Sequence, residues 1–128
     1  MNLIKFMPHL TLEYSNNVIE KKLLVELFQK LHLLLADNLP TQIASCKSRA
    51  IEFAVFTIGK GNSDAAFVHV SLKVLPGRSQ SILESTGQHL LKALKQHFAQ
   101  SISRLKLQIS LEISELQSTY KTYTFLSN

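Results

Sequence analysis

The residues of this chain best suited to acid–base chemistry are the pair Met7-Pro8 near its start. If the chain began at Pro8 after loss of Met7, the proline nitrogen would be a free secondary amine. An α-amino group titrates at about 8 in model peptides, so at the start of a buried strand it can act as a general base near neutral pH. In the sequence as written, six residues precede Met7. The proline nitrogen is then a tertiary amide, whose delocalised lone pair accepts no proton usefully.

The other residues with reactive or metal-binding side chains have simpler interpretations. Cys46 is the single cysteine, so the chain forms no intrachain disulfide, which fits a reducing compartment. We favour a small buried residue over a nucleophile as the role of this cysteine. His9 and His69 fall in expected strands, where we favour a histidine satisfied within the sheet or at a subunit contact over one that acts in a site. The sequence predicts no metal, because no metal-ligand spacing joins the histidines on the expected helices, His32, His89 and His97.

Length and composition narrow the class of protein. A chain of 128 residues fits one domain, and 45% hydrophobic residues are enough for a core. The net charge is +5, but the basic residues are scattered without interleaved aromatics, so we expect a small anionic substrate and no nucleic acid. Apolar runs are too short for a membrane span, and residues 1–6 are too short for a signal peptide. We therefore expect no membrane partner and a cytoplasmic location.

The elements that must position Pro8 follow from the periodicity of the first half. Alternation of apolar and polar residues after Pro8 predicts a strand. Ser15-Asn16-Asn17 offers helix caps, with Glu20 three residues after Asn17, and apolar residues then recur at helical spacing. In chain order, we expect a strand over 8–14, a helix from Ile19 to Leu35, a stop at 37–40, a strand over 50–57 and a turn-rich link at 59–64.

The second half repeats this order. Pro76-Gly77 breaks a clear strand, and a helix begins at Ser79 or Ser81, where Ser81 and Glu84 have the spacing of a capping box. The last strand has the cleanest alternation of the chain. The expected elements are a strand over 67–75, a helix with its apolar face from Ile82 to Phe98, a strand over 105–113 and a tail over 120–128 that reaches a neighbouring subunit.

Two strand–helix–strand units predict an α/β (α+β) fold, with one four-stranded mixed sheet and both helices on one face. The other face of the sheet is then bare. Its last strand presents polar residues there, while the early strands are partly apolar on both faces. Association as a closed cyclic oligomer is the economical way to cover that face.

Several motifs, in order and at matching spacing, resemble the 5-carboxymethyl-2-hydroxymuconate isomerase family of the tautomerase superfamily. The resemblance runs from Met7 to about Gln117. It implies a homotrimer with two β-α-β units per subunit, active sites near subunit interfaces and no cofactor. The motifs that carry it are Met-Pro-His-Leu-Thr-Leu-Glu-Tyr-Ser-Asn-Asn (7–17), Ala-Ala-Phe-Val-His-Val-Ser-Leu-Lys (65–73), Gly-Arg-Ser (77–79) and Ile-Ser-Leu-Glu-Ile-Ser-Glu-Leu (109–116).

The resemblance also implies which residues act. Pro8 matches the catalytic proline, Arg78 matches one substrate-binding arginine, and Lys47 stands where the family has another. Lysine keeps the charge but loses the bidentate fork for a planar carboxylate. Arg49 also has a family counterpart, and strand alternation puts it on the same face as Lys47. The implied reaction is the enol–keto isomerisation of a small unsaturated dicarboxylate in aromatic-compound catabolism.

The sequence divides into an N-terminal extension, residues 1–7, and one tautomerase-like domain, residues 8–128, with a tail from about 118. Two functions follow from this division. One is an active isomerase with a free nitrogen at Pro8. The other is a catalytically impaired trimeric protein that binds an anion while residues 1–7 block Pro8. In a third arrangement, residues 3–6 extend the first strand backwards and seal the pocket.

Overall fold

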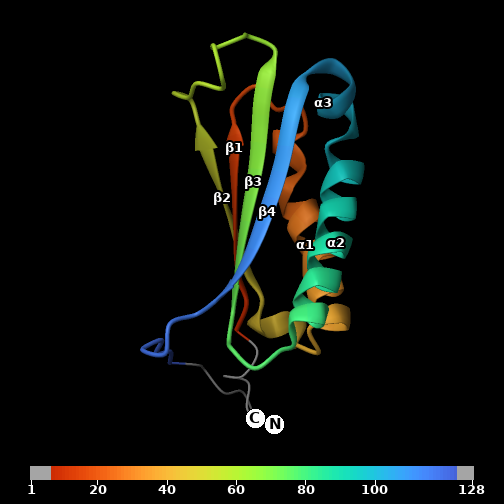
Figure 1. Cartoon of the computed structure of the whole chain (residues 1–128). Coiled ribbons are helices and arrows are strands. Elements are labelled where there is room, and N and C mark those ends of the chain that lie inside the picture. The colour runs from red at the N-terminus through yellow and green to blue at the C-terminus, as the bar shows by residue number, and fades with distance from the viewer. Residues whose placement is uncertain (1–6, 124–128) are drawn as a thin grey trace.

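The computed structural model describes residues 7–123 and has two strand–helix–strand units, as the periodicity predicts (Figure 1). The extension at residues 3–6 and the tail beyond residue 123 lie outside the described residues. Single 3₁₀ turns, at Lys21–Leu23 and Ile43–Ser45, flank the first helix. The regular elements are β1 (His9–Ser15), α1 (Leu24–Asn38), β2 (Lys47–Phe53), β3 (Ala65–Val74), α2 (Gln80–His97), α3 (Ala99–Arg104) and β4 (Lys106–Glu115).

The four strands form one mixed sheet in the order β2-β1-β3-β4. β1 pairs in parallel with β2, β3 pairs in parallel with β4, and the two halves join through the antiparallel pair β1 and β3. The helices lie together on one side of the sheet (Figure 1). The predicted fold class, with two β-α-β units and the helices on one face, is therefore confirmed.

The core lies between the sheet and the helices. β1 and β3 alternate buried and half-buried residues, so every second side chain points at α1 and α2. Complete burial of one leucine is worth about 1.5–3 kcal/mol, so this layer fixes the register of the central strands. Its fully buried members include Leu10, Leu12, Leu27, Leu31, Leu35, Val68, Val70, Leu72, Leu90, Leu94 and Phe98.

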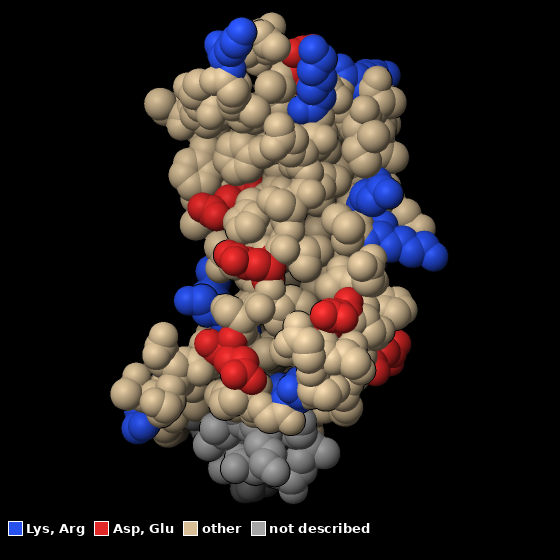
Figure 2. Space-filling model, in the orientation of Figure 1, with Lys and Arg blue, Asp and Glu red and all other residues tan. Residues whose placement is uncertain are grey.

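The opposite face of the sheet carries no helix among the described residues. The strand register places His9 beside Lys47 on one side and Lys73 on the other, and Thr11 beside Arg49 and Ser71. Most of the surface in Figure 2 is uncharged, with isolated acidic and basic side chains rather than a patch of one sign. The last strand contributes polar side chains to this bare face, as its alternation predicts.

Two local predictions for the first half are wrong. Asn17 is not a helix cap: its side-chain amide donates to the carbonyl oxygen of Ala65 at 2.8 Å, and α1 begins only at Leu24. The strand predicted over 50–57 runs instead from Lys47 to Phe53. β2 is an edge strand whose pairing with β1 starts at His9 and stops at Ser15, so β2 ends where its partner ends.

The second helix begins at Ser79, one of the two predicted positions. The Ser79 hydroxyl accepts a hydrogen bond from the backbone N–H of Ile82 at 3.3 Å. Ser81 lies inside the helix, so the predicted capping box of Ser81 and Glu84 is wrong. α3, which continues the helical layer after Phe98, was not predicted from the sequence. Over residues 7–123, no helix is both long and apolar enough to cross a bilayer.

Candidate active site

The predicted site residues gather at one end of the sheet, where β1 and β2 begin and β3 ends (Figure 1). Pro8 precedes β1, and its carbonyl oxygen accepts a hydrogen bond from the backbone N–H of Lys47 at 3.1 Å. Arg78 follows β3 after a short turn. The topology therefore places Pro8 and Arg78, which are 70 positions apart in the sequence, at the same end of the sheet.

Pro8 is buried, and so is the residue before it. Met7 is 2% exposed, and the Lys47 ammonium lies 3.6 Å from its sulfur. The same ammonium donates to the carbonyl oxygen of Ser45 at 3.5 Å. With Met7 attached, the nitrogen of Pro8 is an amide that cannot act as a base, and Lys47 contacts the methionine that precedes it.

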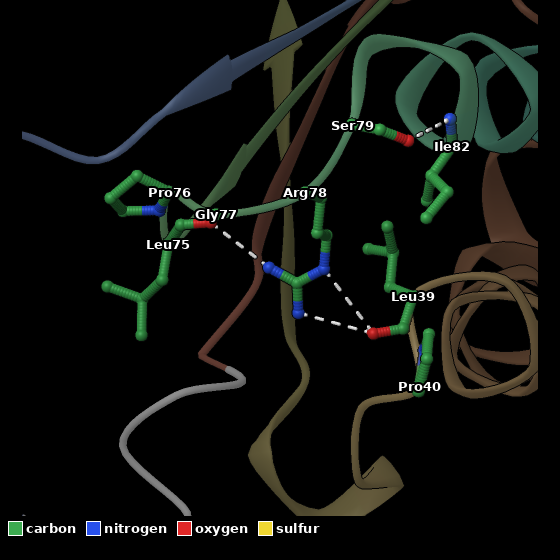
Figure 3. Close-up of a pocket in the computed structure, with 8 residues that line it drawn as sticks. All are labelled: Leu39, Pro40, Leu75, Pro76, Gly77, Arg78, Ser79 and Ile82. Carbon is green, nitrogen blue, oxygen red and sulfur yellow. Dashed lines mark hydrogen bonds between the residues drawn. The ribbon is translucent and has the colours of Figure 1, made fainter.

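Arg78 is held by backbone carbonyl groups from two segments (Figure 3). Its Nη1 donates to the Leu75 oxygen at 3.0 Å, and its Nε and Nη2 donate to the Leu39 oxygen at 3.4 and 3.2 Å. Gly77 makes the turn possible, because its φ of 121° is in the region that favours glycine. Burial lowers the pKa of Arg78, which remains a cation at neutral pH.

The position of Leu39 at the end of a helix explains why its carbonyl oxygen accepts hydrogen bonds from an arginine. α1 ends at Asn38, and Pro40 follows Leu39. The last carbonyl groups of a helix lack intrahelical donors and carry its negative dipole end. The guanidinium of Arg78 supplies both the donors and the positive charge that this end requires. A first hollow, of about 510 Å³, adjoins this guanidinium. It is lined by Leu39, Pro40, Leu75, Pro76, Gly77, Arg78, Ser79 and Ile82.

Arg49 belongs to a second hollow, on the bare face of the sheet. Its Nη2 lies 2.7 Å from Nδ1 of His9, and Nε2 of His9 lies 3.0 Å from the hydroxyl of Tyr120. This hollow measures about 390 Å³ and is lined by His9, Thr11, Arg49, Ile51, Ser71, Lys73, Leu116 and Tyr120. Lys47 and Arg49 occupy alternate positions of β2, so they share the bare face as predicted.

The four predicted residues thus share one end of the sheet but not one cavity. Arg78 lines the first hollow and Arg49 lines the second, while Pro8 and Lys47, within the described chain, line neither. The link between His9, Arg49 and Tyr120 was not foreseen. Tyr120 lies 111 residues from His9 in sequence, in a segment without periodicity, so no sequence signal identifies it.

The remaining candidate groups have structural partners. Cys46 is buried, and burial raises the pKa of its thiol to about 11, which matches an inert small residue rather than a nucleophile. Nδ1 of His69 lies 2.7 Å from the Ser110 hydroxyl, and Nε2 of His32 lies 2.7 Å from the Ser48 hydroxyl. Between residues 7 and 123, no three His, Cys, Asp or Glu side chains lie close enough to hold a metal ion.

The fold and the position of the site define an isomerase of the tautomerase superfamily. A sequence model of the 5-carboxymethyl-2-hydroxymuconate isomerase family matches residues 8–125, and the chain belongs to that family. The 5-carboxymethyl-2-hydroxymuconate Delta-isomerase of Escherichia coli is 34% identical over 113 residues, which cover 88% of this chain and 90% of the relative.

Solved structures share the fold. A 5-carboxymethyl-2-hydroxymuconate isomerase from Deinococcus radiodurans R1 has a TM-score of 0.86 and 34% identity, with 96% of this chain and 95% of that chain covered. A fused 4-OT, described as a symmetric trimer, has a TM-score of 0.61 and 17% identity, with 82% of this chain and 84% of that chain covered.

Proposed function

We propose that this protein is an enol–keto isomerase of the 5-carboxymethyl-2-hydroxymuconate type, with the nitrogen of Pro8 as general base and acid. It acts on a small unsaturated dicarboxylate in the catabolism of aromatic compounds. The observation that carries this proposal is the convergence of Pro8, Lys47 and Arg78 at one end of the sheet. The family match supports it, because that match begins at Pro8.

The reaction moves a proton from an enol oxygen to a carbon of a conjugated dienoate. One group with a pKa near the working pH can remove the proton and deliver it again. A free amine on Pro8 meets that need, because burial disfavours its protonated form, and positive charge from Lys47 and Arg78 at the same end of the sheet acts in the same direction. Both effects lower the pKa of the amine. The proposed mechanism needs no cofactor.

The cations have a second role in this proposal. Arg78 and Arg49 each offer a planar guanidinium that can bind a carboxylate with two hydrogen bonds, and Lys47 offers a point charge. The same positive charges stabilise negative charge that develops on the substrate oxygen as the enol loses its proton. We assign substrate binding to Arg78, Arg49 and Lys47.

We further propose that the protein works as a cytoplasmic homotrimer. The bare face of the sheet supports this, because association through it would cover Ile51, which is 45% exposed, and the neighbouring half-buried Phe53 and Phe67. The fused 4-OT, described as a trimer, supports the same assembly through its shared fold. The two hollows would then be completed by residues of a neighbouring subunit.

The test compares two forms of the chain, residues 1–128 and residues 8–128, in an isomerase assay with a hydroxymuconate-type dicarboxylate. The shorter form has a free amine on Pro8, so we expect its activity to exceed that of the longer form by about 100-fold, within the usual range for general acid–base catalysis. Pro8→Ala in the shorter form should remove most of that activity while the oligomer stays intact. Equal activity of all three proteins would refute the role of Pro8.

One observation favours a second function. Met7 is buried and in contact with Lys47, so a chain that keeps residues 1–7 has a closed environment around Pro8. Such a protein would bind an anion at the cations of this end without proline-based catalysis. The assay above separates the two functions, because the second predicts dicarboxylate binding by residues 1–128 with no isomerase activity that depends on Pro8.

A further inference from the structure

Arg49 is a predicted substrate-binding cation, and its hydrogen bond goes to a titratable group. Its Nη2 lies 2.7 Å from Nδ1 of His9. A guanidinium has donors and no acceptor, so Nδ1 of His9 must accept this hydrogen bond. The proton of the neutral imidazole is then on Nε2, which donates to the Tyr120 hydroxyl at 3.0 Å. The contacts thus define one tautomer and one protonation state of His9.

The third member of this chain of hydrogen bonds is fixed by its own segment. The backbone N–H of Leu116 donates to the Val74 oxygen at 2.8 Å, and the N–H of Tyr120 donates to the Gln117 oxygen at 2.9 Å. The segment after β4 therefore turns back toward β1. The Tyr120 ring meets the His9 ring edge-on, with centroids 5.8 Å apart and planes at 72°. Tyr120 restrains His9 by ring contact as well as by its hydroxyl.

The groups around His9 keep it neutral. Lys47 of β2 and Lys73 of β3 lie directly opposite it in the strand register, and Arg49 is its hydrogen-bond partner. Glu13, on the same strand and face, is four residues away and lies opposite His69 of β3 in the strand register. Burial lowers the pKa of His9 below its ordinary value of 6.5, and Arg49, Lys47 and Lys73 lower it further.

We propose that His9 is a positioning residue for Arg49, and that Tyr120 restrains His9 in turn. Neutral His9 accepts from Arg49 and holds the guanidinium in the hollow of the bare face, toward a carboxylate of the substrate. Protonated His9 has no acceptor at Nδ1 and repels Arg49, so acid releases the guanidinium. This inference rests on the proposed function for the identity of the ligand, but the hydrogen bonds and the release are properties of the free protein.

Two substitutions separate positioning from a merely structural role. In His9→Asn the side-chain oxygen can take the place of Nδ1, so the acceptor for Arg49 is kept. In His9→Gln the side-chain amide can take the place of Nε2, so the donor to Tyr120 is kept and the acceptor for Arg49 is lost. Loss of a charge-assisted hydrogen bond weakens binding by about 10-fold. We expect the KM of residues 8–128 for the dicarboxylate to rise about 10-fold in His9→Gln and to change little in His9→Asn, with kcat kept in both.

The pH dependence provides a second measurement. As pH falls below 6.5, through the lowered pKa of His9, the KM of the unsubstituted protein should rise, and this rise should be absent in His9→Asn. Tyr120→Phe keeps the ring contact and removes the hydroxyl, so its KM should rise less than that of His9→Gln. Equal losses in His9→Asn and His9→Gln, or a KM that is flat with pH in the unsubstituted protein, would overturn the proposal.

The tautomer is measured without any enzymatic activity. Long-range ¹H–¹⁵N correlation spectra of the full chain should show His9 protonated on Nε2 at neutral pH, and glutarate, used as a simple dicarboxylate probe, should bind more weakly to His9→Gln than to His9→Asn. Protonation on Nδ1, or equal glutarate affinity, overturns the role of His9. If no form of the chain isomerises a substrate, the proposed function fails while these measurements still decide the role of His9.

Discussion

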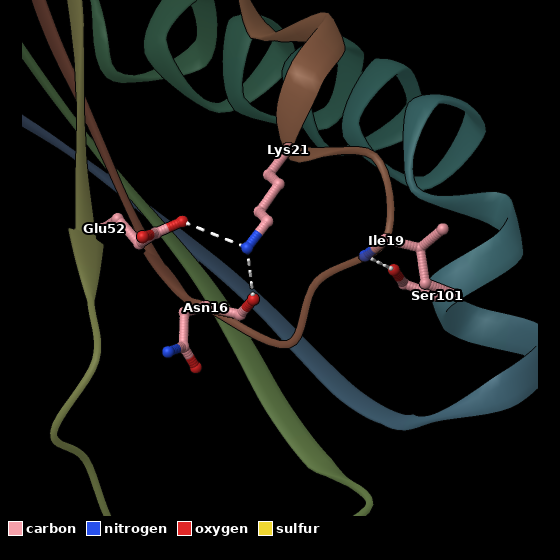
Figure 4. A network of polar contacts seen from close by, with 5 residues as sticks. All are labelled: Asn16, Ile19, Lys21, Glu52 and Ser101. Atoms are coloured by element: carbon pink, nitrogen blue, oxygen red, sulfur yellow. Dashed lines mark hydrogen bonds and ion pairs between the residues drawn. The ribbon is translucent and has the colours of Figure 1, made fainter.

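The two ends of the sheet use their charged side chains in different ways. At the end where β1 begins, Arg78 donates hydrogen bonds to backbone carbonyl oxygens, and Arg49 is hydrogen-bonded to His9. The Lys47 ammonium contacts the carbonyl oxygen of Ser45 and the sulfur of Met7. At the other end, Lys21 lies between the Glu52 carboxylate, at 3.5 Å, and the Asn16 carbonyl oxygen, at 2.9 Å (Figure 4). A carbonyl oxygen orients a cation but leaves its positive charge uncompensated. A carboxylate orients the cation and also neutralises its charge.

A second carboxylate at the far end joins two distant segments of the fold. Glu20 is buried and accepts hydrogen bonds from the backbone N–H groups of Gln100 and Ser101 and, at 2.6 Å, from the Ser101 hydroxyl. The Ser101 hydroxyl in turn accepts from the N–H of Ile19, so the loop before α1 is fixed to α3 (Figure 4). The two ends therefore differ in the acceptors that hold their cations, and we propose that the end with Pro8 binds an anion while the other end closes the fold.

The largest effect that separates the two ends is expected from Arg78→Ala. This change removes the hydrogen bonds to the carbonyl oxygens of Leu39 and Leu75. It also removes the guanidinium to which we assign substrate binding. We expect kcat/KM of residues 8–128 to fall about 100-fold, since the hydrogen bonds of a charged group contribute about 1.5–3 kcal/mol. Steady-state kinetics measure it. Arg78→Lys is the matched control and should recover only part of the activity, because it lacks the planar fork. Full recovery would contradict bidentate binding.

At the far end, Glu20→Gln should reduce stability and leave activity unchanged. An amide places a donor against the N–H groups of Gln100 and Ser101, so we expect a loss of about 2–3 kcal/mol in the free energy of unfolding. Urea denaturation of the folded protein measures this loss. Lys21→Met is the control: it removes the partly exposed ion pair with Glu52 and the hydrogen bond to the Asn16 carbonyl oxygen, and it should cost less than Glu20→Gln, about 1 kcal/mol.

The same carboxylate gives the stability a defined pH dependence. Burial alone would raise the pKa of Glu20, but the hydrogen bonds from Ser101 and Gln100 outweigh it and lower the pKa below 4.5. The stabilisation is therefore fully present above pH 4.5 and is lost as the pH falls through the lowered pKa. Glu20→Gln should not show this loss. An identical acid dependence in both proteins would contradict the assignment.

The smallest effect on activity is expected from Lys47→Arg. If Lys47 contacts the dicarboxylate, the guanidinium should bind it with two hydrogen bonds where the ammonium makes one. We expect a several-fold lower KM, measured by steady-state kinetics with residues 8–128. An unchanged or higher KM would remove Lys47 from the site and leave Arg49 and Arg78 as the substrate-binding cations.

Much of this arrangement was predictable from local patterns. The alternation of the strands and the spacing of the helices define the two units, and the topology of those units then puts Pro8, Lys47 and Arg78 at one end. What the sequence did not reveal depends on distant partners. Glu20 has the spacing of a cap for the first helix, yet it binds α3, which lies about 80 residues away. Tyr120 reaches His9 only because the chain turns back after β4.

The claim that carries the most weight is that the working protein has a free nitrogen on Pro8. Intact mass spectrometry of the protein purified from the cells that make it tests this directly. We predict a mass that corresponds to a chain beginning at Pro8, without residues 1–7. A mass that includes Met7 and the residues before it would contradict proline-based catalysis and leave the anion-binding function in its place.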